Sequence, residues 1–365
     1  MTFSISIAGD AWRSHTQQVR DQVHGAEAAL IPVIKANGYG LGQALLAQEA
    51  TRLGVRAIAV GTVFEVESVA ADFHGDVIVL EPIDPRDEVA AASWSELSQS
   101  HLGPRLIATV ATSRGLDLVI DTFAHPRVVL EGLTSMRRFG FEGPKLREAW
   151  KHAAQAVSSG RLRLHGLAVH LPMQPNSADF DEILQLADEI ADFDTSAHVM
   201  LSHVDVQQLE MLRRHNPDLR FSLRIGTALW FGDRSFLQAR GTVLSVHRVQ
   251  RGQTFGYNHR TAGSDGFVIA VSGGTSHGVA LHAPSPVRTL RQRLVALGLG
   301  AFNAAGRVKS PFSWEGTPLW FAEPPHQLVS LLWVPRHTEP PHVGSVLPAN
   351  VRYTITRADD VRITD

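Results

Sequence analysis

Short apolar runs alternate with helix-like segments over roughly 200 residues, and this alternation constrains the fold more than any other feature. The segment Gln43–Leu53 places apolar residues at three- and four-residue spacings, which is typical of an amphipathic helix. Further helices are expected at Val63–Asp72 and Pro85–Leu97, the last with an irregular segment as the alternative. The expected strands are Ala28–Ile34, Ala57–Val60, Val77–Leu80, Leu106–Val110, Val128–Leu133, Leu164–His170, His198–Ser202 and Phe221–Gly226.

Eight such repeats favour an α/β fold closed into an (α/β)8 TIM-type barrel. An open, doubly wound sheet is the alternative. The loop after the first strand lacks the G-x-G-x-x-G dinucleotide fingerprint that would support the open sheet, because a lysine and a tyrosine stand there instead.

The pattern changes after about Ser235, where the expected strands lose their partner helices. Turn signals such as RGQ, GSDG and EGT separate these strands. They are expected at Ala239–Val249, Phe267–Val271, Leu328–Val334 and Val351–Ile363. We therefore expect a barrel domain at residues 9–234 and a mostly β C-terminal domain at 235–365, which residues 1–8 join as a strand over Thr2–Ala8.

Composition and charge exclude several classes of protein. The chain has 365 residues, of which 44% are hydrophobic, so it can bury two sizeable cores. A net charge of −2 gives no electrostatic case for nucleic acid or an acidic membrane surface. The absence of cysteine excludes disulfides, thiolate metal sites and a cysteine nucleophile. With no signal-like N-terminus and no apolar run near the roughly 20 residues that span a bilayer, we expect a soluble cytoplasmic protein.

A lysine ends the first expected strand and precedes a glycine-rich loop, in the segment IPVIKANGYGLG (Ile31–Gly42). Burying a charged amine is costly, so Lys35 is either a strand-end lysine whose amine reaches solvent or a functional amine. The three glycines of the loop would let its backbone approach an anion, and Tyr39 offers a phenol beside it. An amine that can form a Schiff base next to an anion-binding loop is what pyridoxal 5'-phosphate requires.

The segment KANGYGLG resembles the lysine motif of the alanine racemase family of fold type III pyridoxal phosphate enzymes, whose usual form is close to KANAYGHG. The resemblance extends from about Ala28 to Gly232 and holds again at Tyr257. It implies a pyridoxal phosphate cofactor bound through Lys35 and an amino-acid racemase that interconverts L-alanine and D-alanine. The matching positions are Lys35, Ala36, Asn37, Tyr39, Gly40 and Gly42.

Four further strand-end residues resemble positions of the family's cofactor site. Arg138, in TSMRRFGF, resembles the arginine of TGMGRLGF, which contacts the cofactor's phenolic oxygen and the substrate carboxylate. His170, in HGLAVHLP, matches a histidine beside the cofactor ring, and Ser202 matches a hydroxyl at the phosphate. Glu131 stands where the family commonly has a lysine, which often carries a carbamate that braces the arginine corresponding to Arg138. The glutamate would supply that anion directly. Each residue is otherwise an ordinary core or surface side chain.

The segment RIGTALWFG resembles the family's R-x-G-I-x-x-Y-G. Backbone N–H groups at Gly226 and Thr227 would hold the cofactor phosphate. The resemblance places Arg224 opposite the pyridine nitrogen, where a permanently cationic guanidinium keeps that nitrogen unprotonated. An unprotonated ring is a weaker electron sink, which limits side reactions such as transamination.

Tyr257, in FGYNHRT, resembles the tyrosine of the family's V-S-Y-G-x-T segment, which enters the site from the neighbouring subunit. Racemisation needs one group that removes a proton from Cα and a second that returns one on the opposite face. The resemblance assigns these roles to Lys35 and Tyr257 and implies a head-to-tail homodimer with shared active sites. A turn tyrosine with its hydroxyl in water is the alternative.

The resemblance fades after Tyr257, at segments that line the family's substrate entrance. VSGGTSHGV lacks the tyrosine of the family's G-Y-A-D-G segment, and FAEPPHQLVS lacks its methionine and aspartate. A racemase for another amino acid is therefore an alternative. Two others are a D-threonine-aldolase-like lyase, in which His277 and His282 could bind a metal, and a non-catalytic pyridoxal-phosphate-binding protein. The preferred interpretation requires no metal.

Overall fold

The structure is a computed structural model that describes residues 2–173, 176–281, 289–291, 293, 300 and 308–365. The chain divides into two compact units. The barrel unit comprises Arg13–Gly38 and Gln43–Gly232, and the β unit comprises Met1–Trp12, Tyr39–Gly42 and Asp233–Asp365.

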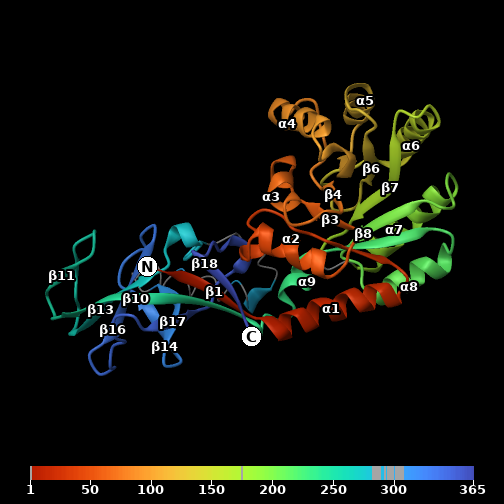
Figure 1. Cartoon of the computed structure of the whole chain (residues 1–365). Helices are drawn as coiled ribbons and strands as arrows, with labels where there is room; N and C mark the ends of the chain where they lie inside the picture. The colour runs from red at the N-terminus through yellow and green to blue at the C-terminus, as the bar shows by residue number, and fades with distance from the viewer. Residues whose placement is uncertain (1, 174–175, 282–288, 292, 294–299, 301–307) are drawn as a thin grey trace. The chain divides into compact units, whose positions relative to one another are not determined.

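Eight parallel strands form the barrel unit in the order β2-β9-β8-β7-β6-β5-β4-β3 (Figure 1). Just beyond β2, Val33 bridges Ala59 of β3, and the N–H of Ile34 donates to the Ala59 carbonyl oxygen at 2.7 Å. These contacts join the two ends of the sheet, so the predicted TIM-type barrel is confirmed. The strands are β2 (Ala29–Pro32), β3 (Ala57–Val60), β4 (Asp76–Val79), β5 (Leu106–Val110), β6 (Arg127–Gly132), β7 (Arg163–His170), β8 (His198–Ser202) and β9 (Arg220–Ile225).

An aliphatic layer fills the barrel interior, as is usual for this architecture. Residues two positions further along a strand face the same side. The layer therefore determines which side chains point inward at the carboxyl ends of the strands, where barrel enzymes bind their ligands. It consists of Ile31, Val33, Ala59, Ile78, Ile107, Val129, Ala168 and Met200.

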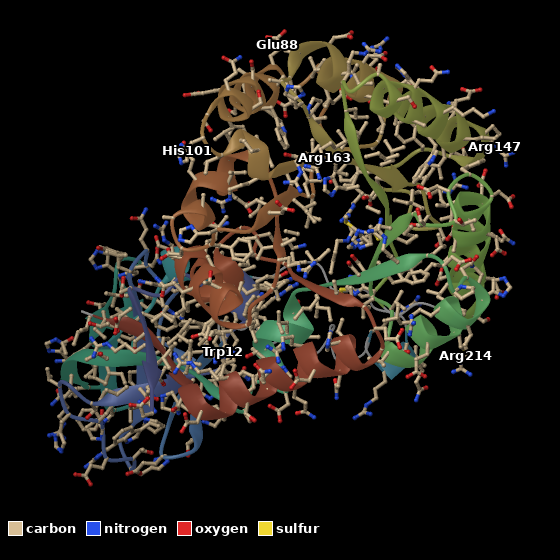
Figure 2. All side chains as sticks on the ribbon, turned by 45° about the vertical axis from the view of Figure 1, so that its right-hand side comes forward. Trp12, Glu88, His101, Arg147, Arg163 and Arg214 are labelled. Atoms are coloured by element: carbon tan, nitrogen blue, oxygen red, sulfur yellow. The ribbon has the colours of Figure 1, made fainter. Side chains whose placement is uncertain are left out.

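A helix follows each barrel strand, and Figure 1 shows helices α4 to α7 on the outside of the strands. Side chains on the outer faces are charged: Glu88, Arg147 and Arg214 point away from the barrel (Figure 2). Within the described ranges, no helix is long and apolar enough to cross a membrane. The helices are α1 (Gly9–Gly25), α2 (Gln43–Arg52), α3 (Val66–Ala70), α4 (Glu88–Gln99), α5 (Ser113–Thr122), α6 (Gly143–Ser158), α7 (Ser177–Ala191), α8 (Val206–His215) and α9 (Thr227–Phe231).

The β unit contains an eight-stranded sheet in the order β13-β16-β15-β14-β17-β10-β1-β18, in which β10 also pairs with β13. Strand β1 is antiparallel to β10 and parallel to β18. The strands are β1 (Phe3–Ala8), β10 (Leu237–Val249), β13 (Gly266–Ser272), β14 (Lys309–Trp314), β15 (Thr317–Phe321), β16 (Val329–Pro335), β17 (Val346–Ala349) and β18 (Asp360–Thr364), with a separate hairpin of β11 (Thr254–Phe255) and β12 (Arg260–Thr261). The prediction of a mostly β part after the barrel is confirmed.

Three groups of elements differ from the sequence-based expectations. Strands β14, β15 and β17 were not predicted, and each contains a proline, which is a signal against strands. The strand expected at Val351–Ile363 is wrong, because the chain forms a 3-10 turn at Tyr353–Ile355 and β18 begins only at Asp360. Burial of Tyr353 outweighs the local preference for strand. The helix expected at Val63–Asp72 divides into a 3-10 turn and α3.

Three histidines of the barrel unit are held neutral by burial. Burial lowers the pKa of His165 to about 4, of His170 to about 3 and of His198 to about 4. The unfolded chain binds protons near the ordinary pKa of 6.5. As the pH falls below about 6.5, the unfolded state binds more protons than the folded state, so these histidines reduce stability in acid and have no effect above that pH.

We predict that His198→Gln weakens the pH dependence of the free energy of unfolding. The loss of that free energy between about pH 7.5 and pH 5.5 should be smaller by about 1 kcal/mol, because one protonatable group no longer favours the unfolded chain. Urea unfolding at the two pH values measures the difference. His337→Gln, at an exposed histidine of the β unit, is the control. A pH dependence identical to that of the natural protein would contradict the prediction.

Candidate active site

Four polar side chains face the barrel interior at the carboxyl ends of β6 to β9. Their orientation follows from strand register, since paired residues of neighbouring strands face the same side. Glu131 lies opposite Ala168 of the aliphatic layer, and His170 lies two residues beyond Ala168. Ser202 is opposite His170, and Arg224 is opposite Ile31 of the layer.

The buried guanidinium of Arg224 organises this group. Nε donates to Ser202 Oγ at 3.0 Å, and Nη2 donates to the Val169 carbonyl oxygen at 2.9 Å. Nη1 lies 3.7 Å from Glu131 Oε2, and both side chains are at most 5% exposed. A buried charge is tolerated only when it is paired and hydrogen-bonded, and all three nitrogens of Arg224 have such a neighbour. Ser202, which the resemblance assigns to phosphate, thus positions Arg224.

Glu131 is paired with Arg224 and not, as the resemblance implies, with Arg138. Burial raises the pKa of Glu131, and the positive charges of Arg224 and then Arg138 oppose that rise. Arg138 therefore acts on Glu131 through its charge, whereas Arg224 makes the ion pair. Glu131 thus places a negative charge next to the buried guanidinium of Arg224.

Lys35 follows β2 at the carboxyl end of the barrel strands and is exposed. Partial burial of its amine nevertheless lowers the pKa of Lys35. The positive charges of Arg138 and Arg224 lower it further, and Glu65 opposes them. A lowered pKa favours the neutral amine, which is the nucleophilic and proton-accepting form.

The backbone next to Lys35 is held by Glu65, a residue not identified from the sequence. The N–H of Ala36 donates to Glu65 Oε1 at 3.1 Å, and the N–H of Gly61 donates to Oε2 at 2.8 Å. Ala36 has a φ of 53°, in the left-handed region that a non-glycine residue adopts only when its surroundings enforce it. The sequence signal that could have identified Glu65 is an acidic residue in the first turn after β3, the second barrel strand.

Two histidine rings and Arg138 lie near the carboxyl ends of the barrel strands. The rings of His170 and His203 meet edge to face, with centroids 5.1 Å apart. His170 is neutral near pH 7, because burial first and then the neighbouring cations lower its pKa to about 3. The Arg138 guanidinium lies 5.2 Å from the ring centroid of the adjacent Phe139. The Arg138 side chain is exposed.

Gly226 and Thr227 lie at the start of α9, directly after the last residue of β9, Ile225. The first intrahelical bond runs from the Trp230 N–H to the Gly226 carbonyl oxygen at 3.0 Å, so the N–H groups before Trp230 point out of the helix end. Trp230 Nε1 also donates to the Val33 carbonyl oxygen at 2.8 Å. This bond ties α9 to the strand that leads into Lys35.

The glycine-rich loop after Lys35 is divided between the units, with Tyr39–Gly42 in the β unit. Tyr39 is buried there with a φ of 56°. A Cβ built at Gly40 would lie 2.5 Å from the Tyr353 carbonyl oxygen, and the φ of Gly40 is 83°. Close approach to protein backbone and a positive φ therefore explain why glycine stands at position 40.

Tyr257 lies in the β unit, between β11 and β12, with its side chain 79% exposed. The structure of a single chain thus assigns the two expected bases to different units. His277, considered as a metal ligand, has both ring nitrogens engaged: Gly274 N–H donates to Nδ1 at 3.1 Å, and Nε2 lies 3.2 Å from Asp359 Oδ1. His282 lies outside the described residues.

We predict that Glu131→Gln lowers the free energy of unfolding by about 1–3 kcal/mol, because it leaves the buried Arg224 without a charged partner. Denaturant unfolding measures this change. Glu148→Gln, at an exposed position of α6, is the matched control and should have no comparable effect. A Glu131→Gln protein as stable as the control would show that the pair contributes no net stability.

Comparison with known proteins agrees with this architecture. The chain is 27% identical over 307 residues to an alanine racemase of Mycolicibacterium vanbaalenii, an alignment that covers 76% of this chain and 72% of the relative. It is 26% identical over 257 residues to an alanine racemase of Mycobacterium ulcerans, covering 64% of this chain and 62% of that protein. The chain therefore spans less than two thirds of the second relative.

Solved structures share the fold. An alanine racemase from E. faecalis superposes with a TM-score of 0.70 at 16% identity, covering 100% of this chain and 98% of the other. A histidine racemase from Leuconostoc mesenteroides subsp. sake gives 0.66 at 14% identity, again covering 100% and 98%. Residues 7–232 match the family described as the alanine racemase N-terminal domain. Because this match spans more than half of the chain, the protein belongs to the alanine racemase family.

Proposed function

We propose that the protein is a pyridoxal-phosphate-dependent amino-acid racemase that interconverts L-alanine and D-alanine. The observation that carries the proposal is the position of Lys35. Its amine has a lowered pKa and lies at the carboxyl end of a barrel whose interior holds the fully partnered cation Arg224. This combination supplies a nucleophilic amine and a fixed positive charge in one site.

The side chains present suit an anionic aldehyde cofactor. The carboxyl end of the barrel carries the exposed cations Lys35 and Arg138 above the buried cation Arg224, which is paired with the carboxylate Glu131. Lys35 would hold the cofactor covalently through its aldehyde, and the N–H groups at Gly226 and Thr227 would bind its phosphate. Tyr39 and Ser202 are further expected cofactor contacts. The bound cofactor supplies an electron-accepting ring that stabilises negative charge at Cα once the proton is removed.

The protein's own groups would then divide the proton chemistry between them. Arg138 would bind the substrate carboxylate and fix the orientation of Cα, since a guanidinium matches a carboxylate in geometry and charge. Lys35 would accept or return the α-proton on one face, and Tyr257 of a partner subunit on the other. Arg224 would keep the ring nitrogen unprotonated, and neutral His170 would pack beside the ring without adding charge. The functional form would be a homodimer, because each site needs a Tyr257 from the other chain.

Alanine is the proposed substrate because the curated relatives described above are alanine racemases. The fold itself does not select the amino acid, since a histidine racemase superposes about as well as the alanine racemases do. A racemase for another amino acid is therefore the second candidate. The exposed Arg138 would serve any α-carboxylate and is compatible with both.

We predict that Lys35→Ala abolishes the visible absorbance band of the lysine-linked cofactor, because no amine remains to bind the aldehyde. The measurement is an absorbance spectrum after incubation with pyridoxal phosphate and removal of unbound cofactor. Lys145→Ala, at an exposed lysine of α6, should keep the full band. A full band in Lys35→Ala would show that another group binds the cofactor.

We predict that Tyr257→Phe removes the contribution of one proposed base and leaves that of Lys35 intact. The equilibrium constant of racemisation is one, so kcat/KM falls equally in both directions whichever base is lost. Exchange of the α-hydrogen with solvent is the informative measurement. In Tyr257→Phe, exchange should persist for the enantiomer that Lys35 deprotonates and fall about 100-fold or more for the other, together with net racemisation.

The unaltered protein, assayed with both enantiomers of alanine, is the reference for this experiment. Exchange that falls by the same small factor for both enantiomers would contradict the two-base assignment. Absence of any exchange or inversion in the unaltered protein, with the visible band present, would contradict the alanine racemase proposal itself.

A further inference from the structure

The backbone around Tyr257 is held by a single buried carboxylate. The N–H of Tyr257 donates to Glu323 Oε1 at 3.2 Å, and the N–H of Asn258 is 3.4 Å from Oε2. Glu323 is 1% exposed and follows β15. A Cβ built at Gly256 would lie 2.3 Å from this carboxylate, so only glycine allows the loop to approach it so closely.

The same carboxylate holds the side chain that contacts the Tyr257 ring. His326 Nε2 lies 2.7 Å from Glu323 Oε1, and the imidazole packs against the phenol ring with centroids 4.3 Å apart and planes 40° apart. Without these contacts the exposed tyrosine would sample several rotamers. Glu323 and His326 restrict both its backbone and one face of its ring.

The segment that carries Glu323 and His326 is itself held by hydrogen bonds to other segments of the β unit. The N–H of Thr275 donates to the His326 carbonyl oxygen, and the N–H of Ser276 to that of Gln327, both at 2.9 Å. Arg260 Nη1 donates to the Ala322 carbonyl oxygen at 2.8 Å. A rigid support is what a side chain needs if its hydroxyl must meet a reacting atom in a neighbouring subunit.

We propose that Glu323 and His326 are positioning residues for Tyr257. Together they would set the direction of its phenol so that it serves as the second base. This inference rests on the proposed racemase function. Neither residue contacts a reacting atom in the proposed mechanism. Their effect would be transmitted through Tyr257 alone, which distinguishes positioning from general support of the β unit.

The first test measures α-hydrogen exchange of each alanine enantiomer by cofactor-loaded Glu323→Gln and His326→Ala. Exchange that depends on Tyr257 should fall about 10- to 100-fold, because a small misplacement of a reacting group has an effect of this size. Exchange that depends on Lys35 should stay within about twofold, and the visible cofactor band should be unchanged. His337→Ala and Glu339→Gln, at exposed positions of the β unit, are the matched controls.

A double-mutant cycle sharpens this test. If Glu323 acts through Tyr257, adding Glu323→Gln to Tyr257→Phe should cause no further loss of exchange or racemisation. A loss that multiplies with that of Tyr257→Phe, or an equal loss for both enantiomers, would overturn the positioning role. The racemase proposal would survive that result.

The second test does not depend on activity. The chain has three tyrosines, so protein labelled with fluorotyrosine should give three fluorine NMR resonances, and Tyr257→Phe assigns one of them. His326→Ala and Glu323→Gln should shift or broaden the Tyr257 resonance and leave the other two in place. An unmoved Tyr257 resonance would overturn the inference. If the unaltered protein exchanges no α-hydrogen, the proposed function fails and the inference fails with it, whatever the spectrum shows.

Discussion

The buried guanidinium of Arg224 is the constraint on which the polar end of the barrel depends. Removing this charge from water is unfavourable unless partners replace the lost hydration. Glu131, Ser202 and the Val169 carbonyl oxygen supply those partners from three neighbouring strands. An aliphatic layer lies beneath these partners, so the guanidinium is in surroundings of low polarity, where its charge acts more strongly on a ligand than it would in water.

A glutamate carboxylate holds the backbone beside each of the two proposed bases, although the bases lie in different units. Next to Lys35, Glu65 accepts the N–H groups of Ala36 and Gly61. Next to Tyr257, Glu323 accepts the N–H of Tyr257 itself. In each case a carboxylate fixes the backbone beside a functional side chain, while the side chain itself stays exposed. Such an arrangement combines a precise position with access to a ligand.

The fold was predictable because the eight barrel strands are apolar and regularly spaced. Lys35, Glu131, His170, Ser202 and Arg224 were recognisable as strand-end residues, and register brings the last four together on the inner face. The partners of these residues were not predictable. The pairing of Glu131 with Arg224 depends on how deeply each side chain is buried in the barrel. The contact of Glu323 with Tyr257 joins positions far apart in the chain. Strands β14, β15 and β17 were not predicted because each contains a proline, which normally signals against a strand.

The most direct test of the racemase account follows α-deuterium uptake and chirality together. Cofactor-loaded protein would be incubated in D₂O with L-alanine, L-serine, L-histidine and other L-amino acids. We predict deuterium at Cα with inversion, fastest for alanine. Inversion restricted to another amino acid would keep the racemase mechanism and correct the substrate. A bound-cofactor spectrum with no exchange on any amino acid would contradict the account.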